Sequence, residues 1–189
     1  MQQSDFDKYF DEAYEKKLPN FDEHINVAVV GKVSAGKGSL LNAIMERGRL
    51  DPLAEVGSCS GVTTKITPYR LGKDVLIIDC PGLDDVRAEN SEETKGFLES
   101  IDLGLFVVTG SADASQKSNY DDLKRSCKKI MVILNKIDEW DDLEESAIDL
   151  VIQQWMGVLG TNAIYPTCTK GYDPKMRQNA PMDIRGEIS

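Results

Sequence analysis

Three separated clusters of glycine and polar residues carry the chemistry of this sequence, and the first is suited to binding phosphate. Residues 31–39 read Gly-Lys-Val-Ser-Ala-Gly-Lys-Gly-Ser. Glycines let the backbone wrap an anion so that successive N–H groups point at it, and Lys37 adds a positive charge for the terminal phosphates. We therefore predict a phosphate-binding loop whose contacts come from Gly31, Ser34, Ala35, Gly36, Lys37, Gly38 and Ser39.

One position of this loop departs from the usual pattern. The residue after the lysine is ordinarily Ser or Thr, whose hydroxyl binds Mg²⁺, but Gly38 stands there and Ser39 follows one place later. Successive residues of a helix point about 100° apart, so Ser39 is predicted to face away from the metal. The Mg²⁺ site is therefore expected to be weakened.

The second cluster follows an apolar run at 75–78 and reads Asp-Cys-Pro-Gly at residues 79–82. Asp79 is placed to hold Mg²⁺ through a water molecule, and Gly82 to donate its backbone N–H to a γ-phosphate. The loop 83–90 is then expected to move when that phosphate leaves.

The third cluster, Asn-Lys-Ile-Asp at residues 135–138, is suited to recognising a base. The carboxylate of Asp138 can accept two hydrogen bonds from guanine, whereas adenine has no such pair of donors, and a site built on such bonds rejects the analogue that lacks them. Asn135 is expected to brace the phosphate loop, and the stem of Lys136 to lie along the plane of the base.

These three motifs, in this order, resemble those of the translation-factor-related class of P-loop GTPases. Residues 34–37 together with 39–43 are similar to the bacterial Era-like group and to dynamin-like GTPase domains, and the resemblance spans about residues 25–170. It implies a chain that binds GTP and GDP with Mg²⁺, hydrolyses GTP slowly and acts as a conformational switch. The alternative is a nucleotide-binding module with little or no hydrolysis, because Gly38 replaces the metal-binding Ser or Thr.

The resemblance also places residues outside the three clusters. A first switch at residues 61–65 would carry the threonine that closes over Mg²⁺ and the γ-phosphate, with Thr64 preferred and Thr63 as the alternative. The expected catalytic residues are Lys37, Thr64, Gly82 and Ser34. Ser34 would approach a monovalent cation or, alternatively, only shape the turn. A second loop would contact guanine O6 through the residues Cys168, Thr169 and Lys170.

Alternating apolar runs and helical stretches must position these clusters. Strands are predicted at 25–30, 66–71, 75–79, 103–109, 130–135 and 163–165, and helices at 39–46, 91–100, 119–128 and 142–159. The pattern is typical of a three-layer α/β P-loop NTPase fold with a mostly parallel six-stranded sheet. A Gly-Lys-Asp turn at 72–74 adds one antiparallel edge strand. The last helix is predicted from residues Leu143, Ala147, Leu150, Val151, Gln154, Trp155 and Val158.

Three segments divide the 189 residues. We expect an acidic N-terminal segment at 1–24, with a helix at 4–17 that packs on the domain edge or, alternatively, joins a partner interface. The GTP-binding domain follows at 25–170. A tail at 171–189 looks like the start of a truncated final helix.

Composition narrows the classes of function. The net charge is −10, which disfavours binding to nucleic acid or to an anionic membrane. The four cysteines form no C-x-x-C pair, and His24 is the only histidine, so zinc, disulfide and histidine-based nucleophilic chemistry are not indicated. We expect a cytoplasmic protein whose partners are guanine nucleotide and a second copy across the nucleotide face. Membrane association would need regions beyond this sequence.

Overall fold

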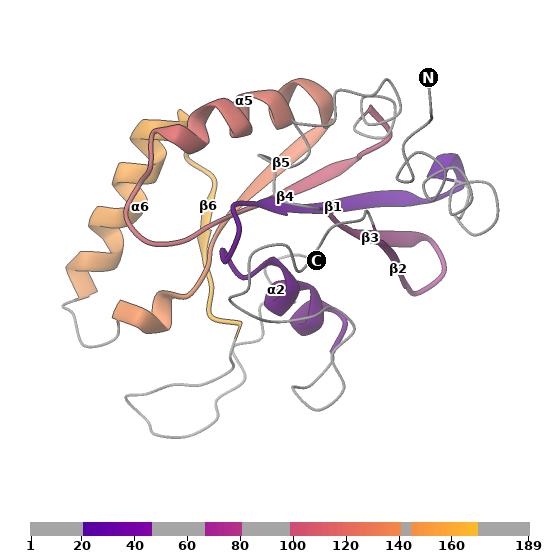
Figure 1. Ribbon diagram of the computed structural model, residues 1–189, viewed down its shortest axis with the longest axis horizontal. Coiled ribbons are helices and arrows are strands. Elements are labelled where there is room, and N and C mark those ends of the chain that lie inside the picture. The colour runs from indigo at the N-terminus through magenta and orange to yellow at the C-terminus, as the bar shows by residue number, and fades with distance from the viewer. Residues whose placement is uncertain (1–20, 47–66, 81–98, 141–144, 170–189) are drawn as a thin grey trace, which may run out of the picture.

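Six strands form one sheet in the computed structural model, which describes residues 21–46, 67–80, 99–140 and 145–169. The strand order is β2-β3-β1-β4-β5-β6 (Figure 1). Long apolar runs with several β-branched residues build the three central strands, as expected for strands buried on both faces. The strands are β1 (Ile25–Gly31), β2 (Thr67–Leu71), β3 (Val75–Asp79), β4 (Leu103–Val108), β5 (Lys129–Leu134) and β6 (Ile164–Pro166).

The strand pairing confirms the predicted sheet. β1 runs parallel to β3 and β4, and β5 runs parallel to β4 and β6. Among the six described strands, only β2 is antiparallel, and it pairs with β3 across the turn that the sequence indicates. Each strand lies within one residue of its predicted ends. The carboxyl ends of five parallel strands therefore meet at one edge of the sheet.

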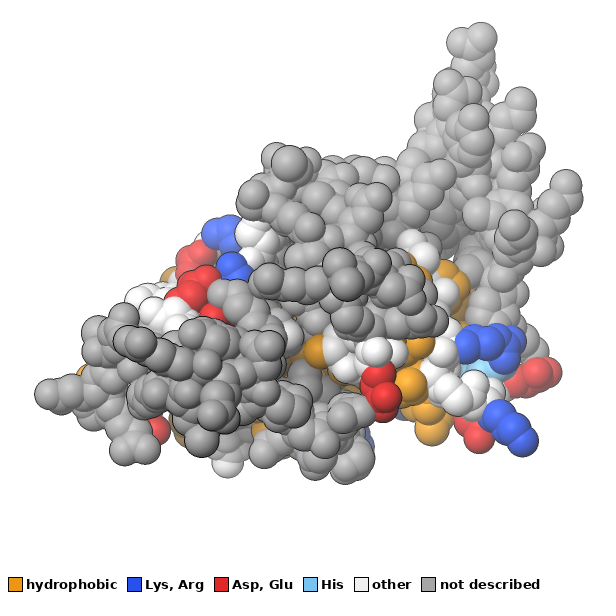
Figure 2. Space-filling model, turned by 90° about the horizontal axis from the view of Figure 1, so that it is seen from below, with side chains coloured by type: hydrophobic (Ala, Val, Ile, Leu, Met, Phe, Trp, Pro, Cys, Tyr) orange, Lys and Arg blue, Asp and Glu red, His pale blue; other side chains and the backbone are white. Residues whose placement is uncertain are grey.

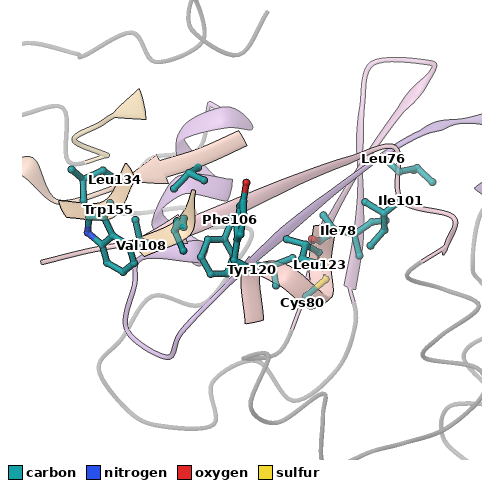
Figure 3. Close-up of a cluster of buried hydrophobic side chains, with 14 residues drawn as sticks. Leu76, Ile78, Cys80, Ile101, Phe106, Val108, Tyr120, Leu123, Leu134 and Trp155 are labelled. Carbon is teal, nitrogen blue, oxygen red and sulfur yellow. Dashed lines mark hydrogen bonds between the residues drawn. The ribbon is translucent and has the colours of Figure 1, made fainter. Parts of the chain in front are cut away.

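Helices cover both faces of the sheet and complete the three layers (Figure 1). Helix α2 (Lys37–Ile44) packs on one face, where it buries Leu40 and Leu41. Helices α5 (Ser115–Ser126) and α6 (Glu145–Leu159) cover the other face. There Tyr120 meets Phe106 edge to face at a centroid distance of 5.6 Å, and the indole of Trp155 is fully buried (Figure 3). The part of the chain that the structure describes also contains two short 3-10 helices, η1 (Phe21–Glu23) and η2 (Ile137–Trp140).

Several predicted helix boundaries are wrong, and local hydrogen bonds explain the largest error. The helix predicted at 119–128 spans 115–126, because a side-chain oxygen of Asp113 accepts the backbone N–H of Ser115 at 2.9 Å and so satisfies a donor at the helix start. Cys127 already has extended backbone that leads into β5. Helix α2 begins at Lys37 rather than at 39.

The predicted apolar stripe of the last helix needs correction. Leu150 is 58% exposed and Gln154 is exposed, whereas Trp155 and Leu159 are buried. The helix is oriented by the indole, whose Nε1 donates to the carbonyl oxygen of Gly110 at 2.9 Å. The buried face therefore centres on Trp155, and Leu150 falls outside it.

The predicted helix at 4–17, the tail at 171–189 and Leu143 lie outside the described residues, as does most of the helix predicted at 91–100. Within the described ranges, no helix combines the length and hydropathy needed to cross a membrane.

Candidate functional site

The three clusters meet at the edge of the sheet where the parallel strands end. The phosphate loop follows β1, Asp79 closes β3, and Asn135 directly follows β5. In open α/β sheets, ligands bind at this carboxyl edge. The topology therefore brings Ala35 and Asn135 into contact, although they are 100 positions apart in the chain.

Two glycines shape the phosphate loop by close approach. A Cβ on Gly31 would overlap the carbonyl oxygen of Val107 in the neighbouring strand, and one on Gly36 would overlap the side-chain nitrogen of Asn135. Gly36 also has φ +91°, a left-handed conformation that favours glycine. Ser34 lies in the same loop with φ 65° and is exposed. The backbone can therefore curl tightly at the start of α2.

The start of α2 is suited to an anion. Gly36 precedes the helix with no side-chain hydrogen bond capping its end, and the first turn contains no acidic residue. The first N–H groups of a helix lack partners within the helix, and the dipole there favours negative charge. A phosphate fits this position.

The ammonium group of Lys37 lies against the phosphate loop. Its Nζ donates to the carbonyl oxygen of Gly31 at 3.1 Å and to that of Lys32 at 3.3 Å, and the residue is only 9% exposed. A buried cation needs anionic or polar partners. Lys37 lies at the start of α2, where a phosphate would bind. Its ammonium group could therefore exchange the two carbonyl oxygens for phosphate oxygens.

Asp79 supplies negative charge on the α2 side of the sheet. It is 4% exposed and stands in register with Val29 of β1, whose side chain packs in the core beneath α2. Burial, and then the charge of Asp79, raises the pKa of the Cys80 thiol far above its usual range. The same two causes raise the pKa of Tyr69. Cys80 itself packs in the core on the opposite face.

The described residues contain no group of three or more His, Cys, Asp or Glu side chains that could hold a metal. Mg²⁺ in nucleotide sites is usually bound by one or two protein groups together with phosphates and water. A single buried carboxylate at Asp79 fits that chemistry.

Asn135 joins the base-recognition cluster to the phosphate loop. Its side chain is fully buried, and Nδ2 donates to the carbonyl oxygen of Ala35 at 3.0 Å. This is the bracing contact that the sequence predicts. Lys136 follows with φ 63°, and its Nζ lies 3.5 Å from Glu139. Asp138 is half-buried in η2, and its contact with guanine stays a prediction.

The loop after β6 is tied to this cluster through Thr167, a residue that the sequence reasoning missed. Its N–H donates to the carbonyl oxygen of Leu134 at 2.8 Å, and its own carbonyl accepts from Ile137 at 3.3 Å. Thr167 Oγ1 and Asn135 Oδ1 are both buried without a hydrogen-bond partner in the structure. The signal in the sequence is a threonine directly before the Cys168-Thr169 pair.

The remaining predicted site residues divide into two groups. Cys168 is buried and Thr169 half-buried in the loop after β6, and Gly38 and Ser39 are half-buried in the first turn of α2. Their contacts with nucleotide stay predictions. Four predicted contacts lie in segments that the structure does not describe, and their roles stay predictions. These are Thr63, Thr64, Gly82 and Lys170.

Comparison with known proteins decides the family. The family described as 50S ribosome-binding GTPase matches residues 26–136, more than half of the chain. The chain belongs to this GTPase family. It is a guanine-nucleotide-binding P-loop domain of the Era-like type, as the three motifs predict.

The chain matches only part of the curated proteins to which it is similar. The tRNA modification GTPase MnmE of Desulfotalea psychrophila is 32% identical over 123 residues, which are 60% of this chain and 25% of that protein. MnmE of Helicobacter pylori is 28% identical over 173 residues, 86% of this chain and 37% of that protein. The chain therefore spans well under half of these curated relatives.

Solved structures support the fold of this GTPase domain. Era of Aquifex aeolicus, bound to GDP.AlF4-, superposes with a TM-score of 0.59 at 22% identity. The match covers 76% of this chain and 50% of that one. The shared feature is the P-loop NTPase arrangement of sheet and helices.

Proposed function

We propose that this GTPase domain binds GTP and GDP, hydrolyses GTP slowly and changes conformation with the nucleotide. The bond from Asn135 to Ala35 carries the proposal, because it fixes the base-recognition cluster against the phosphate loop. A single ligand that carries both a guanine base and phosphates would contact the base-recognition cluster and the phosphate loop at the same time. Calorimetry with GDP and ADP tests this: GDP should bind, and ADP binding with equal affinity would contradict the proposal.

The phosphates would be held by the loop and the start of α2. Lys37 would move its ammonium from the carbonyl oxygens of Gly31 and Lys32 to the β- and γ-phosphates. The backbone N–H of Gly82 would contact the γ-phosphate, and Ser34 would lie beside a monovalent cation. Thr64, or alternatively Thr63, would close the site from the first switch.

Asp79 would orient Mg²⁺ through water, and the position of Gly38 lacks the usual hydroxyl ligand. Mg²⁺, when bound, neutralises charge that develops between the β- and γ-phosphates. Asp79 is already buried at the end of β3, in register with Val29 of the strand that leads into the phosphate loop. A missing protein ligand supports slow rather than fast hydrolysis.

Guanine would be selected by Asp138 and by the loop after β6. The carboxylate of Asp138 would accept from two donors on the base, while the stem of Lys136 would lie along its plane. Backbone N–H groups of residues Cys168, Thr169 and Lys170 would donate to guanine O6. The hydrogen bonds of Thr167 support this arrangement because they hold the two loops together.

A binding module that holds nucleotide without turnover is the second candidate, and Gly38 is the observation that favours it. A single-turnover assay with γ-labelled GTP and Mg²⁺ separates the two. Release of labelled phosphate by the wild-type chain, and its loss in Lys37→Ala, would support the hydrolysing switch. Stable, unhydrolysed GTP on the protein would support the binding module.

We also propose a cytoplasmic protein that pairs with a second copy through its nucleotide face. Val33 is 42% exposed in the phosphate loop and offers an apolar contact there. Direct nucleic-acid binding is not expected of this chain, although one Era structure contains nucleotides 1506-1542 of 16S ribosomal RNA. On the face in Figure 2, the coloured side chains include both basic and acidic ones. Light scattering with GDP and with a non-hydrolysable GTP analogue tests pairing, which a monomer in both states would contradict.

A further inference from the structure

The backbone of Lys32 forms hydrogen bonds within the phosphate loop, whereas its side chain forms an ion pair with Asp113, outside the loop. Its carbonyl oxygen accepts from the backbone N–H of Ala35 at 3.2 Å and from Nζ of Lys37 at 3.3 Å. Its own Nζ lies 3.3 Å from a carboxylate oxygen of Asp113. A displacement of Lys32 would therefore disturb both the turn of the loop and the phosphate-binding lysine.

Asp113 is itself held in place by the start of α5. One of its carboxylate oxygens accepts the backbone N–H of Ser115 at 2.9 Å, and the other accepts from Lys32. The hydrogen bonds from Ser115, followed by that from Lys32, hold the pKa of Asp113 below its usual value. The segment between β4 and Asp113 is fixed in turn by the bond from Trp155 Nε1 to Gly110.

The phosphate loop is thus fastened at two points. Asn135 holds Ala35 through a fully buried amide, and Asp113 holds Lys32 through an ion pair whose side chains are 38% and 53% exposed. A pre-organised loop binds its ligand with less loss of conformational freedom than a loose one. We propose that Asp113 is a positioning residue that clamps the phosphate loop through Lys32 and so slows the release of bound guanine nucleotide.

The chemistry of the clamp makes its effect sensitive to salt. Exposed ion pairs are screened at high ionic strength, whereas the buried Asn135 hydrogen bond joins two uncharged groups. An exposed pair is weak, so its loss should speed release by about two- to fivefold. This inference rests on the proposed function, because it concerns release of the guanine nucleotide.

Release of a fluorescent N-methylanthraniloyl GDP, chased with excess GDP, measures the effect directly. Asp113→Asn keeps an oxygen for the N–H of Ser115 but loses the charge, and Lys32→Met removes the other charge. At about 0.05 M salt, each should speed release by about two- to fivefold, and the double variant should be no faster than either single one. At about 1 M salt, the variants should match the wild type.

Two controls separate a clamp from general loss of stability. Asp121→Asn breaks a comparably exposed ion pair to Lys117 on α5, whose side chains are 43% and 41% exposed. Lys32→Arg keeps the charge. Both should release nucleotide at the wild-type rate. An unchanged rate in Asp113→Asn, an increase that persists at high salt, or an equal increase in Asp121→Asn would each overturn the clamp while leaving nucleotide binding intact. If the wild type fails to bind the fluorescent GDP, the proposed function falls, and this inference falls with it.

Discussion

The side-chain nitrogen of Asn135 donates to the carbonyl oxygen of Ala35 at 3.0 Å, although 100 positions separate the two residues in the chain. The bond spans from the end of β5 to the loop after β1, with β4 between these strands in the sheet. It joins the base-recognition cluster directly to the phosphate loop. Changes to either residue should therefore affect both stability and nucleotide affinity.

Asn135→Ala should lower the free energy of unfolding by about 1–3 kcal/mol, because it leaves the carbonyl oxygen of Ala35 without its donor in a buried position. GDP affinity should fall as well, since the phosphate loop loses its brace. Urea unfolding and calorimetry measure the two effects. Asn162→Ala is the matched control because Asn162 is exposed, and it should change neither quantity. A variant as stable as the wild type would argue against the brace.

Asp138→Asn should abolish the preference for guanine or shift it toward xanthine. An amide cannot accept hydrogen bonds from both guanine donors, but its N–H₂ can donate to the extra oxygen of xanthine. Competition of GDP, XDP and ADP against a fluorescent nucleotide measures the preference. Asp149→Asn is a suitable control, because Asp149 is an exposed acid on α6 with no proposed contact to the base. Unchanged discrimination in Asp138→Asn would remove Asp138 from the guanine site.

The sequence predicts the strands and the three clusters well, because both depend on local pattern. Buried parallel strands form continuous apolar runs, and each cluster directly follows such a run. Because parallel strands end at the same edge of the sheet, the strand assignment alone predicts that the clusters lie close together. Asp79 and Asn135 are accordingly both buried, as their positions at the end of β3 and directly after β5 require.

Contacts between distant segments could not be predicted from the sequence. Asp113 reaches Lys32 across 81 positions, and nothing in the local pattern around either residue indicates the pairing. The start of α5 was predicted four residues late because its first turn, Ser-Gln-Lys-Ser, lacks apolar periodicity. Its boundary depends on the carboxylate of Asp113. This carboxylate accepts a local hydrogen bond from Ser115 and a tertiary one from Lys32.

Acid should weaken the contact between Asp102 and Asn26, which lies at the opposite end of β1 from the phosphate loop. Asp102 accepts the backbone N–H of Asn26 at 2.9 Å and pairs with Lys128 at 2.6 Å. Burial alone would raise the pKa of Asp102, but the bonds from Lys128 and Asn26 outweigh it and hold the pKa below its usual value. A depressed pKa in the folded state stabilises the fold above the unfolded value, and this contribution is lost as pH falls through the folded pKa.

The difference in unfolding free energy between wild type and Asp102→Asn measures this contribution. It should be constant from pH about 7 to about 4.5 and should narrow below pH about 3.8. Asp74→Asn serves as a control because Asp74 is exposed, and its difference from wild type should stay small throughout. A difference for Asp102→Asn that grows in acid would contradict the direction of the shift.

Gly38→Ser should restore a hydroxyl ligand to the metal and speed GTP turnover. The loop N–H groups and Lys37 need no side chain at this position, so GDP should bind to the wild type and to the variant alike. One polar partner at a buried charged site is worth roughly 1–3 kcal/mol, which is about five- to 150-fold in a rate or equilibrium. The wild type should therefore show weak dependence of GDP affinity on Mg²⁺, and the variant a stronger one. Titration with Mg²⁺ and single-turnover hydrolysis measure both, and Ser39→Ala is the decisive companion. If Gly38→Ser changes neither quantity while Ser39→Ala weakens both, then Ser39 already supplies the hydroxyl, and the site is not defective.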